Sequence, residues 1–437
     1  MDGHNETRRV HGRVNRRAAL TGLTGAVTGL AALGATPAAA RSGGEGWVDT
    51  WTAMPQLTEP HNLPPAPFTG SDGVLADATL RQTVHLTIGA RRVRLSFSNE
   101  FGGAPLPLTS VAVALPAGGR AGARAVVPGS TLPVTFDGRA SVTVPVGARY
   151  VSDPVDVRVP PGGELTVTVH LADGQRSLSV TSHPGSRTTS HLVAGERVAA
   201  EDLPGATPVD HWYFLSAVEA WAARGSRAVA VLGDSLTDGR GSTTNGNDRW
   251  PDRLAARLRG RRDTEDVAVL NQGAGGNRVL LEGLGPSAVS RLDRDVFARS
   301  GVTRLIVFEG VNDIGTAAAT AAAQEAVTAD LLTAYGQFVT RAHARGVEVY
   351  GATLTPFGGN AAYDDPAGLR EVARREVNAW IRGSGRFDAV LDFDAAVRDP
   401  ARPERLRDTV HDGDWLHLTP GGYALLAAAV PVSLFRD

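Results

Sequence analysis

Polar and apolar residues alternate along much of the first half of the chain, from Gly46 to about Trp221. A period of two is typical of antiparallel strands with one buried face. Turn dipeptides such as Gly102-Gly103 and Asp137-Gly138 separate the alternating runs. The pattern predicts strands over residues 80–88, 92–98, 110–115, 141–146, 155–159, 164–171 and 177–181. Many short strands at this spacing predict an all-β sandwich, of jelly-roll type.

The pattern changes at residues 222–226, after which short apolar runs alternate with stretches of helical period. Apolar runs without alternation predict strands buried on both faces, as in parallel sheets. We expect strands over residues 228–232, 267–270, 304–308, 348–354 and 389–393, and helices over 250–259, 288–298, 321–344, 369–382 and 420–434. This alternation predicts a doubly wound α/β fold with a five-stranded parallel sheet. We therefore expect a β-sandwich domain over 41–223 and an α/β domain over 224–437.

The first forty residues have the organisation of an export signal. A basic start precedes a mostly apolar stretch over 18–35, and Ala38-Ala39-Ala40 supplies the small residues of a cleavage site. The run Asn15-Arg16-Arg17 resembles a twin-arginine signal. We expect residues 1–40 to be a signal peptide and the mature protein to be secreted, without stable insertion in a membrane. A general secretory signal or an uncleaved anchor is the alternative.

Composition narrows the possible chemistry. The net charge of −2 gives no field that would attract nucleic acid, so no such partner is expected. The chain has no cysteine, which excludes disulfides, thiolate zinc sites and a cysteine nucleophile. We expect the protein to be a monomer.

Ser235 is the first candidate for a catalytic residue. It follows the predicted strand over 228–232 and the turn Gly233-Asp234. In open α/β sheets, ligands bind beyond the carboxyl ends of the strands, so a serine hydroxyl held there can act as a nucleophile. The alternative is that Gly-Asp-Ser forms only a turn.

Two more predicted strands end in polar or glycine-rich loops, over residues 271–277 and 309–313. In the common 2-1-3-4-5 strand order these strand ends are neighbours, which would bring Ser235 and Asn312 into one crevice. Near the C-terminus, Asp414 and His417 are three residues apart, so that in a helical turn both would face the same way.

These residue types match the needs of acyl transfer. An imidazole such as that of His417 can take the serine proton, and Asp414 can orient the imidazole. The backbone N–H groups of Ser235 and Gly276, with the side-chain amide of Asn312, would stabilise the oxyanion. Asp412 is an alternative acid, with a poorer spacing to the histidine. A metal site is the other alternative, with the ligands His411, Asp412, Asp414 and His417.

Four sequence blocks resemble those of the SGNH (GDSL) hydrolase family: Gly233-Asp234-Ser235-Leu236, the glycine loop, Gly310-Val311-Asn312-Asp313 and Asp414-x-x-His417. The resemblance covers roughly residues 225–437 and implies a flavodoxin-like three-layer α/β/α fold. It implies a cofactor-free ester hydrolase with Ser235 as nucleophile, Asp414 and His417 as its partners, and Asn312 in the oxyanion hole. Gly276, five residues after Asn271, matches the family's oxyanion glycine better than Gly275.

One departure follows His417. Many family members have a proline next, whereas Leu418-Thr419-Pro420 follows here. Thr419 and Pro420 still predict the N-cap and first turn of a helix. The α/β-hydrolase elbow, Gly-x-Ser-x-Gly, is not present because Thr237 stands where its second glycine would be.

The sequence leaves the substrate open between general carboxylic esters and acetylated polysaccharide. The alternative of a different class is a glycan-binding protein with an inert hydrolase domain, in which Trp212 and Tyr213 would stack on sugars unless they lie in the core. If His417 is the base, activity rises with pH, with an apparent pKa in the neutral range.

Overall fold

The computed structural model describes residues 45–436. The predicted signal peptide and its cleavage site lie outside the described residues. The chain from Gly46 to Ala222 forms antiparallel sheets, and the chain from Arg227 onward forms a parallel sheet with helices. We call these the β-rich part and the α/β part. The division into domains at residue 224 stays a prediction.

Two antiparallel sheets make up most of the β-rich part, as predicted for a sandwich. The smaller has the order β1 (Gly46–Thr52), β15 (Leu215–Ala222), β4 (Val93–Ser98) and β9 (Arg149–Val151). The larger has the order β13 (Thr207–Val209), β12 (Ser190–Ala194), β3 (Ala78–His85), β10 (Glu164–Leu171), β6 (Ser110–Ala114) and β7 (Leu132–Val134). Short strands complete this part: β2 (Gln56–Leu57), β5 (Leu106–Leu108), β8 (Val142–Val144), β11 (Thr181–His183) and β14 (Trp212–Tyr213). Trp212 and Tyr213 are buried in the core.

The prediction that all these strands have one exposed face is wrong for β10. All eight of its residues are buried, although polar and apolar residues alternate along it. Its apolar residues join the core, and on its polar face Thr168 accepts from Arg81 and Glu164 accepts from Asn247. The Arg81 guanidinium donates to Thr168 Oγ1, Arg124 O and Ala200 O. An alternating pattern therefore marks the two faces of a strand without showing that the polar face meets solvent.

Two predicted strands differ from the structure. Residues 155–159 form no strand and contribute only isolated bridges at Val155 and Val159. The strand predicted over 177–181 begins only at Thr181. Residues 155–159 lie opposite only residues 90–93, so one extra residue interrupts the ladder there.

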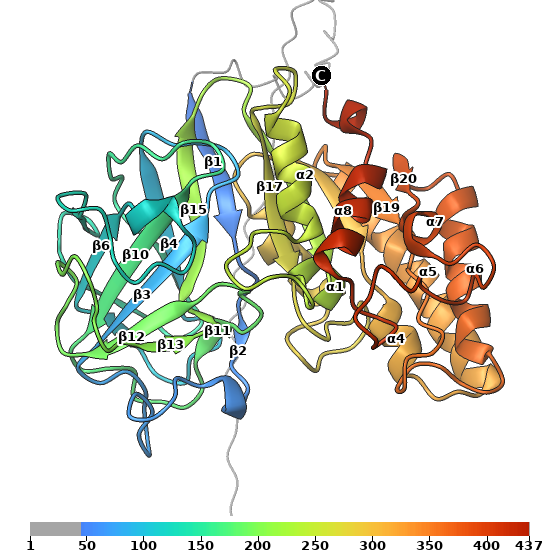
Figure 1. Ribbon diagram of the computed structural model, residues 1–437, viewed down its shortest axis with the longest axis horizontal. Coiled ribbons are helices and arrows are strands. Elements are labelled where there is room, and N and C mark those ends of the chain that lie inside the picture. Colours follow the sequence, from blue (N-terminus) through green and yellow to red (C-terminus); the bar gives the residue numbers. More distant parts are fainter. Residues whose placement is uncertain (1–44, 437) are drawn as a thin grey trace, which may run out of the picture. The chain divides into compact units, whose positions relative to one another are not determined.

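Five parallel strands form the sheet of the α/β part, as predicted. Their order is β17 (Val267–Gly273), β16 (Arg227–Gly233), β18 (Val302–Phe308), β19 (Glu348–Ala352) and β20 (Ala389–Leu391), which is the 2-1-3-4-5 order. Helices α2 (Trp250–Arg259) and α8 (Pro420–Ala429) cover one face, and α5 (Ala321–His343) and α6 (Leu369–Gly383) cover the other (Figure 1). Five of the seven residues of β16 are fully buried apolar residues, because helices cover the sheet on both sides.

Several helices differ from the predicted ones. The helix predicted over 288–298 is a short α3 (Ala288–Leu292) that continues as a π-helical turn. The helix predicted over 420–434 ends at Ala429, because Pro431 has no N–H to continue it. The strand predicted over 389–393 stops at Leu391, since Asp392 caps α7 (Phe393–Val397). Thr419 caps α8 as predicted, accepting a hydrogen bond from Gly422 N.

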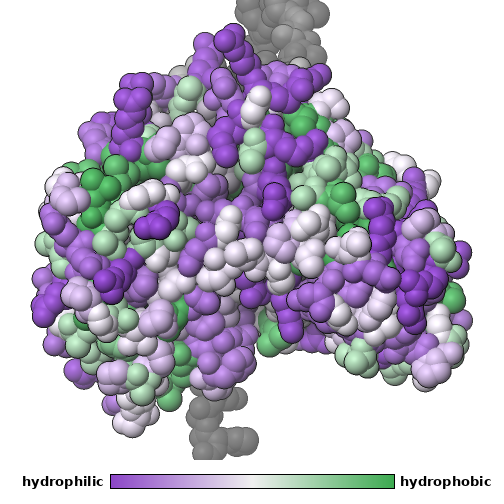
Figure 2. Space-filling view, viewed as in Figure 1, coloured by the Kyte–Doolittle hydropathy of each residue, from purple (hydrophilic) through white to green (hydrophobic). Residues whose placement is uncertain are grey.

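The face of the molecule drawn in Figure 2 is mainly polar. In Figure 2, hydrophilic residues cover most of the face in view, and hydrophobic residues form small separate groups. Among the described residues, none of the helices has the length and hydropathy that crossing a membrane requires.

Candidate active site

Ser235 lies at the carboxyl end of the central strand β16. It begins the one-turn helix α1 (Ser235–Asp238), whose N-cap Asp234 accepts a hydrogen bond from Leu236 N at 2.9 Å. Only glycine fits at position 233, because a Cβ there would lie 2.2 Å from Thr237 Oγ1. The tight turn thus fixes the direction of the serine side chain, and the residue as a whole is 6% exposed.

Ser235, His417 and Asp414 form a continuous chain of hydrogen bonds. Ser235 Oγ is 2.9 Å from His417 Nε2, and His417 Nδ1 is 2.5 Å from Asp414 Oδ2. The carboxylate holds the proton on Nδ1, which leaves Nε2 free to accept the serine proton. The structure therefore brings together the three residues that the sequence suggested as a triad.

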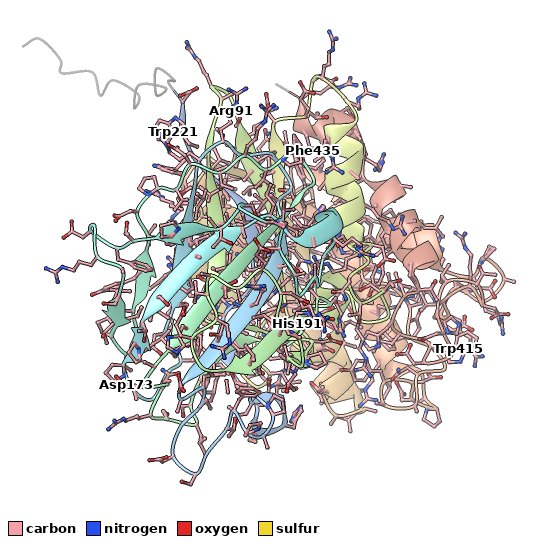
Figure 3. The ribbon with its side chains drawn as sticks, turned by 60° about the vertical axis from the view of Figure 1, so that its left-hand side comes forward. Arg91, Asp173, His191, Trp221, Trp415 and Phe435 are labelled. Carbon is pink, nitrogen blue, oxygen red and sulfur yellow. The ribbon has the colours of Figure 1, made fainter. Side chains whose placement is uncertain are left out.

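The turn that joins Asp414 to His417 is not helical, although a spacing of three residues would also suit a helical turn. Asp414 Oδ1 accepts hydrogen bonds from Leu416 N and His417 N, and the intervening Trp415 has φ +58°. The aspartate is thus held by the turn that it caps, as in an Asx-turn. Trp415, labelled in Figure 3, packs on the His411 ring at 4.1 Å between centroids. Asp412, the alternative acid, is exposed, and in the described part of the chain the hydrogen bond of His417 Nδ1 is to Asp414.

The surroundings of His417 lower the pKa of its imidazole, so the ring stays neutral at a lower pH than that of an ordinary histidine. Burial lowers the pKa of His417, and the charges of Arg240 and Arg187 add to this effect. Asp414 opposes it by hydrogen bond and charge, but does not outweigh it. Burial would raise the pKa of Asp414, but hydrogen bonds from His417 and from Leu416 N lower it below its usual range. The pair therefore holds an anionic carboxylate beside a neutral imidazole at neutral pH.

The predicted oxyanion donors lie in the same pocket as Ser235. Gly276 has φ +70°, and a Cβ at this position would lie 2.5 Å from Leu284 Cδ1, so glycine is required. Asn312, in α4 (Val311–Thr316), donates from Nδ2 to Asn277 O at 2.8 Å. Tyr363 donates its hydroxyl to Asn312 Oδ1 at 2.6 Å. Gly275 lines the pocket too.

The amide of Asn312 is oriented by these two bonds. One Nδ2 hydrogen is used by Asn277, and the other remains for an oxygen in the pocket. Burial raises the pKa of Tyr363, which keeps its hydroxyl protonated and able to donate. Tyr363 lies 51 residues beyond Asn312, and no local sequence signal points to it.

A buried arginine ties the loops of the site together. Arg291, in α3, donates to Gly233 O, Gln272 O and Asn277 Oδ1. These three acceptors belong to the ends of β16 and β17 and to the glycine loop. Nearby, Asp313 accepts from Val279 N and Leu280 N and so anchors the far end of that loop.

The pocket around Ser235 has a volume of about 790 Å³, and the β-rich part supplies part of its lining. These contributors include Glu59, His183, Arg187 and His211. Sequence analysis missed them because they precede Ser235 by 24 to 176 residues and belong to no motif. Arg240 also lines the pocket. Because Arg240 directly follows Thr237-Asp238-Gly239, the sequence could have indicated it as a residue of the site.

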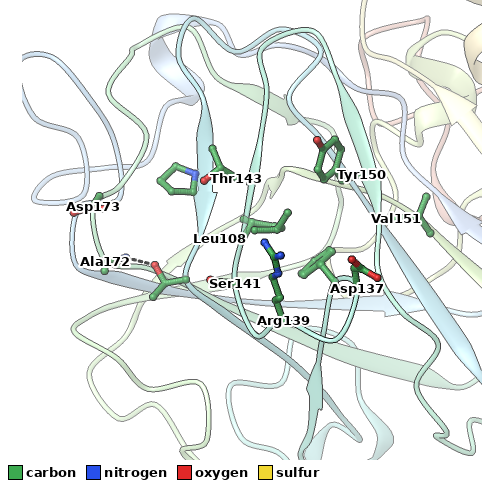
Figure 4. Close-up of a pocket in the computed structure, with 13 residues that line it drawn as sticks. Leu108, Asp137, Arg139, Ser141, Thr143, Tyr150, Val151, Ala172 and Asp173 are labelled. Atoms are coloured by element: carbon green, nitrogen blue, oxygen red, sulfur yellow. Dashed lines mark hydrogen bonds between the residues drawn. The ribbon is translucent and has the colours of Figure 1, made fainter.

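A second hollow lies within the β-rich part (Figure 4). It has a volume of about 690 Å³, and its lining includes Asp137, Arg139, Tyr150 and Asp173. Its lining residues include no histidine to activate its serine and threonine hydroxyls. Within residues 45–436, no group of three or more His, Asp or Glu side chains can hold a metal ion.

Comparison with known proteins places the α/β part in a family. No curated protein matched the chain. Similar solved structures include a lipase/acylhydrolase from Enterococcus faecalis, which is 20% identical, with 48% of this chain and 94% of that chain covered and a TM-score of 0.35. An acetyl xylan esterase, AlAXEase, is 18% identical, with 46% and 96% covered and a TM-score of 0.35. These likenesses bear on neither the substrate nor the roles of single residues.

The sequence profile of the GDSL-like Lipase/Acylhydrolase family matches residues 231–425. The match runs from the strand before Ser235 to the helix after His417, and it agrees with the resemblance noted in the sequence. Residues 231–425 are a GDSL-like lipase/acylhydrolase domain.

Proposed function

We propose that the protein hydrolyses carboxylic esters through an acyl-enzyme on Ser235. The observation that carries this proposal is the hydrogen-bonded chain from Ser235 Oγ through His417 to Asp414, at 2.9 Å and 2.5 Å. Membership of the domain in an acylhydrolase family indicates hydrolase activity and supports the same chemistry.

In the first half-reaction, Ser235 Oγ attacks the ester carbonyl carbon while His417 Nε2 takes its proton. The carbonyl oxygen becomes an oxyanion, which the N–H groups of Ser235 and Gly276 and the amide of Asn312 stabilise. Asp414 stabilises the imidazolium that forms. The C–O bond to the alcohol then breaks, and His417 returns the proton to the leaving alkoxide. The alcohol departs and the acyl group stays on Ser235.

In the second half-reaction, water attacks the acyl carbon and gives a proton to His417. The same donors stabilise the second oxyanion. The bond to Ser235 breaks, the serine oxygen regains the proton from His417, and the carboxylic acid leaves. Each step uses only water and the residues described, and the enzyme ends as it began.

Labelling with a fluorophosphonate tests the proposal directly. The reagent phosphonylates an activated serine, so the parent should react and Ser235→Ala should not. Hydrolysis of 4-nitrophenyl acetate should fall in Ser235→Ala by at least about 10³-fold, because no acyl-enzyme can form. Equal labelling of both proteins, or of neither, would contradict the proposal. Labelling of neither would favour binding without catalysis.

We also propose export through the twin-arginine pathway, on the basis of Asn15-Arg16-Arg17. In the host of the gene, replacing both arginines by lysine (R16K/R17K) should retain the protein inside the cell. Continued appearance of the double variant in the medium would show that another route is used.

A further inference from the structure

Two arginines without an ion-pair partner line the pocket of the proposed catalytic histidine, and Gly241, which follows Arg240, lies against Leu418 O and the Cβ of His417. Arg187 and Arg240 both line the pocket of Ser235, and both act on the charge of His417. Among residues 45–436, neither guanidinium forms a hydrogen bond or salt bridge, and Arg187 Nε is buried without a partner. By contrast, the buried Arg249 beside the same loop is paired with Asp252 at 2.7 Å. Unpaired guanidinium groups beside a site are available to a ligand.

Backbone contacts hold both arginines near the nucleophile. Arg240 N donates to Ser235 O at 3.0 Å, which places Arg240 directly after the helix that begins with Ser235. Arg187 O accepts from Asn245 N at 2.9 Å, so Arg187 is tied to the loop that follows Arg240. The two cations come from the β-rich part and the α/β part and meet at one pocket.

The carboxylates of the pocket do not neutralise these cations. Asp414 is bound to His417, and Asp238 is bound to His183 at 2.9 Å. Glu59 accepts from Gln56 Nε2 and Asn62 Nδ2, and its charge acts on His211. A substrate anion is the remaining partner for Arg187 and Arg240 within the described part of the chain.

The position of Arg187 and Arg240 in the site determines which part of the ester these arginines contact. In the mechanism proposed above, His417 protonates the leaving alcohol, whereas Gly276 and Asn312 face the carbonyl oxygen. Groups beside His417 therefore meet the alcohol part. A guanidinium fork matches the two oxygens of a carboxylate. We propose that Arg187 and Arg240 bind a carboxylate on the alcohol part, so that the substrates are acyl esters of hydroxy acids; this rests on the proposed ester hydrolysis.

Two esters that differ in one charge test this specificity. 4-Acetoxybenzoate carries a carboxylate on its alcohol part, and its methyl ester carries none. The ratio of their kcat/KM values within one protein cancels any loss of active enzyme. We expect this ratio to fall about tenfold in Arg187→Gln or Arg240→Gln and further in the double variant, because each charged hydrogen bond is lost. The change should be mainly in KM, since the carboxylate is held throughout the reaction.

Arg262→Gln is the matched control. Arg262 is exposed, lies after α2 and does not line the pocket, so its removal lowers the net charge equally without touching the site. Added salt should reduce the ratio in the parent more than in the double variant. A ratio in the double variant within twofold of the parent would overturn the specificity. If the parent hydrolyses neither ester, or Ser235→Ala hydrolyses both equally well, the proposed function itself fails.

Discussion

At the scale of single residues, the fixed amide of Asn312 yields a sharp prediction. Its Oδ1 accepts from Tyr363 and its Nδ2 donates to Asn277 O. The second N–H of Nδ2 is therefore oriented to donate to the oxyanion. Asn312→Ala should lower kcat by about 10²–10³-fold with little change in KM, as for other oxyanion donors. Tyr363→Phe removes only the orienting bond and should cost less. Steady-state kinetics on 4-nitrophenyl acetate measure both, and a kcat of Asn312→Ala within threefold of the parent would exclude Asn312 from the hole.

The pH dependence of activity is a second prediction at this scale. His417 acts as a base only when neutral, so activity should rise as the pH passes its pKa. Burial, Arg240 and Arg187 lower this pKa below the usual value of about 6.5. The rise in kcat/KM for a neutral aryl ester should therefore lie on the acidic side of that value, lower than the sequence alone suggested. Replacing Arg240 by Gln should move the rise to higher pH, and a flat profile from pH 4 to 8 would remove His417 from the role of base.

At the scale of elements, the sequence predicts some features far better than others. The parallel strands were located well because burial on both faces requires uninterrupted apolar runs such as that of β16. The turn Gly233-Asp234-Ser235 was also found, since only small and capping residues suit it. The non-helical turn from Asp414 to His417 was not, because it depends on Trp415 adopting φ +58°. Contacts such as that of Tyr363 with Asn312 arise only when distant loops meet.

The bond network of Arg291 leads to a prediction about the elements it joins. Its guanidinium is fully buried and links the ends of β16 and β17 to the glycine loop. Arg291→Leu would leave Glu309 and three acceptors without this donor, so the free energy of unfolding should fall by about 3–5 kcal/mol. Urea denaturation measures the change. Arg345→Gln is the control, because its ion pair with Asp293 is exposed and should contribute under about 1 kcal/mol. Equal effects of the two substitutions would contradict the role of Arg291.

At the scale of the whole molecule, the β-rich part reaches the helix that carries the nucleophile. His183 in β11 binds Asp238, the last residue of α1, at 2.9 Å, and both side chains are buried. The other ring nitrogen of His183 faces Met54 O at 3.0 Å. The contact between His183 and Asp238 is a buried hydrogen bond between the two parts, three residues from Ser235.

Removing one member of this pair leaves the other polar group buried without its partner, which costs about 1–3 kcal/mol. We expect His183→Gln and Asp238→Asn each to destabilise the protein, and the double variant to lose clearly less than the sum of the two. We also expect kcat to fall in each single variant, because Asp238 belongs to α1, the helix that positions the serine hydroxyl. Urea denaturation of the four proteins gives the coupling energy, and kinetics on 4-nitrophenyl acetate give the second readout. The exposed pair His343–Asp388 provides the control cycle, with an expected coupling under about 1 kcal/mol. Strict additivity at His183 and Asp238, with unchanged kcat, would mean that the β-rich part contributes lining residues to the site but does not hold the nucleophile in place.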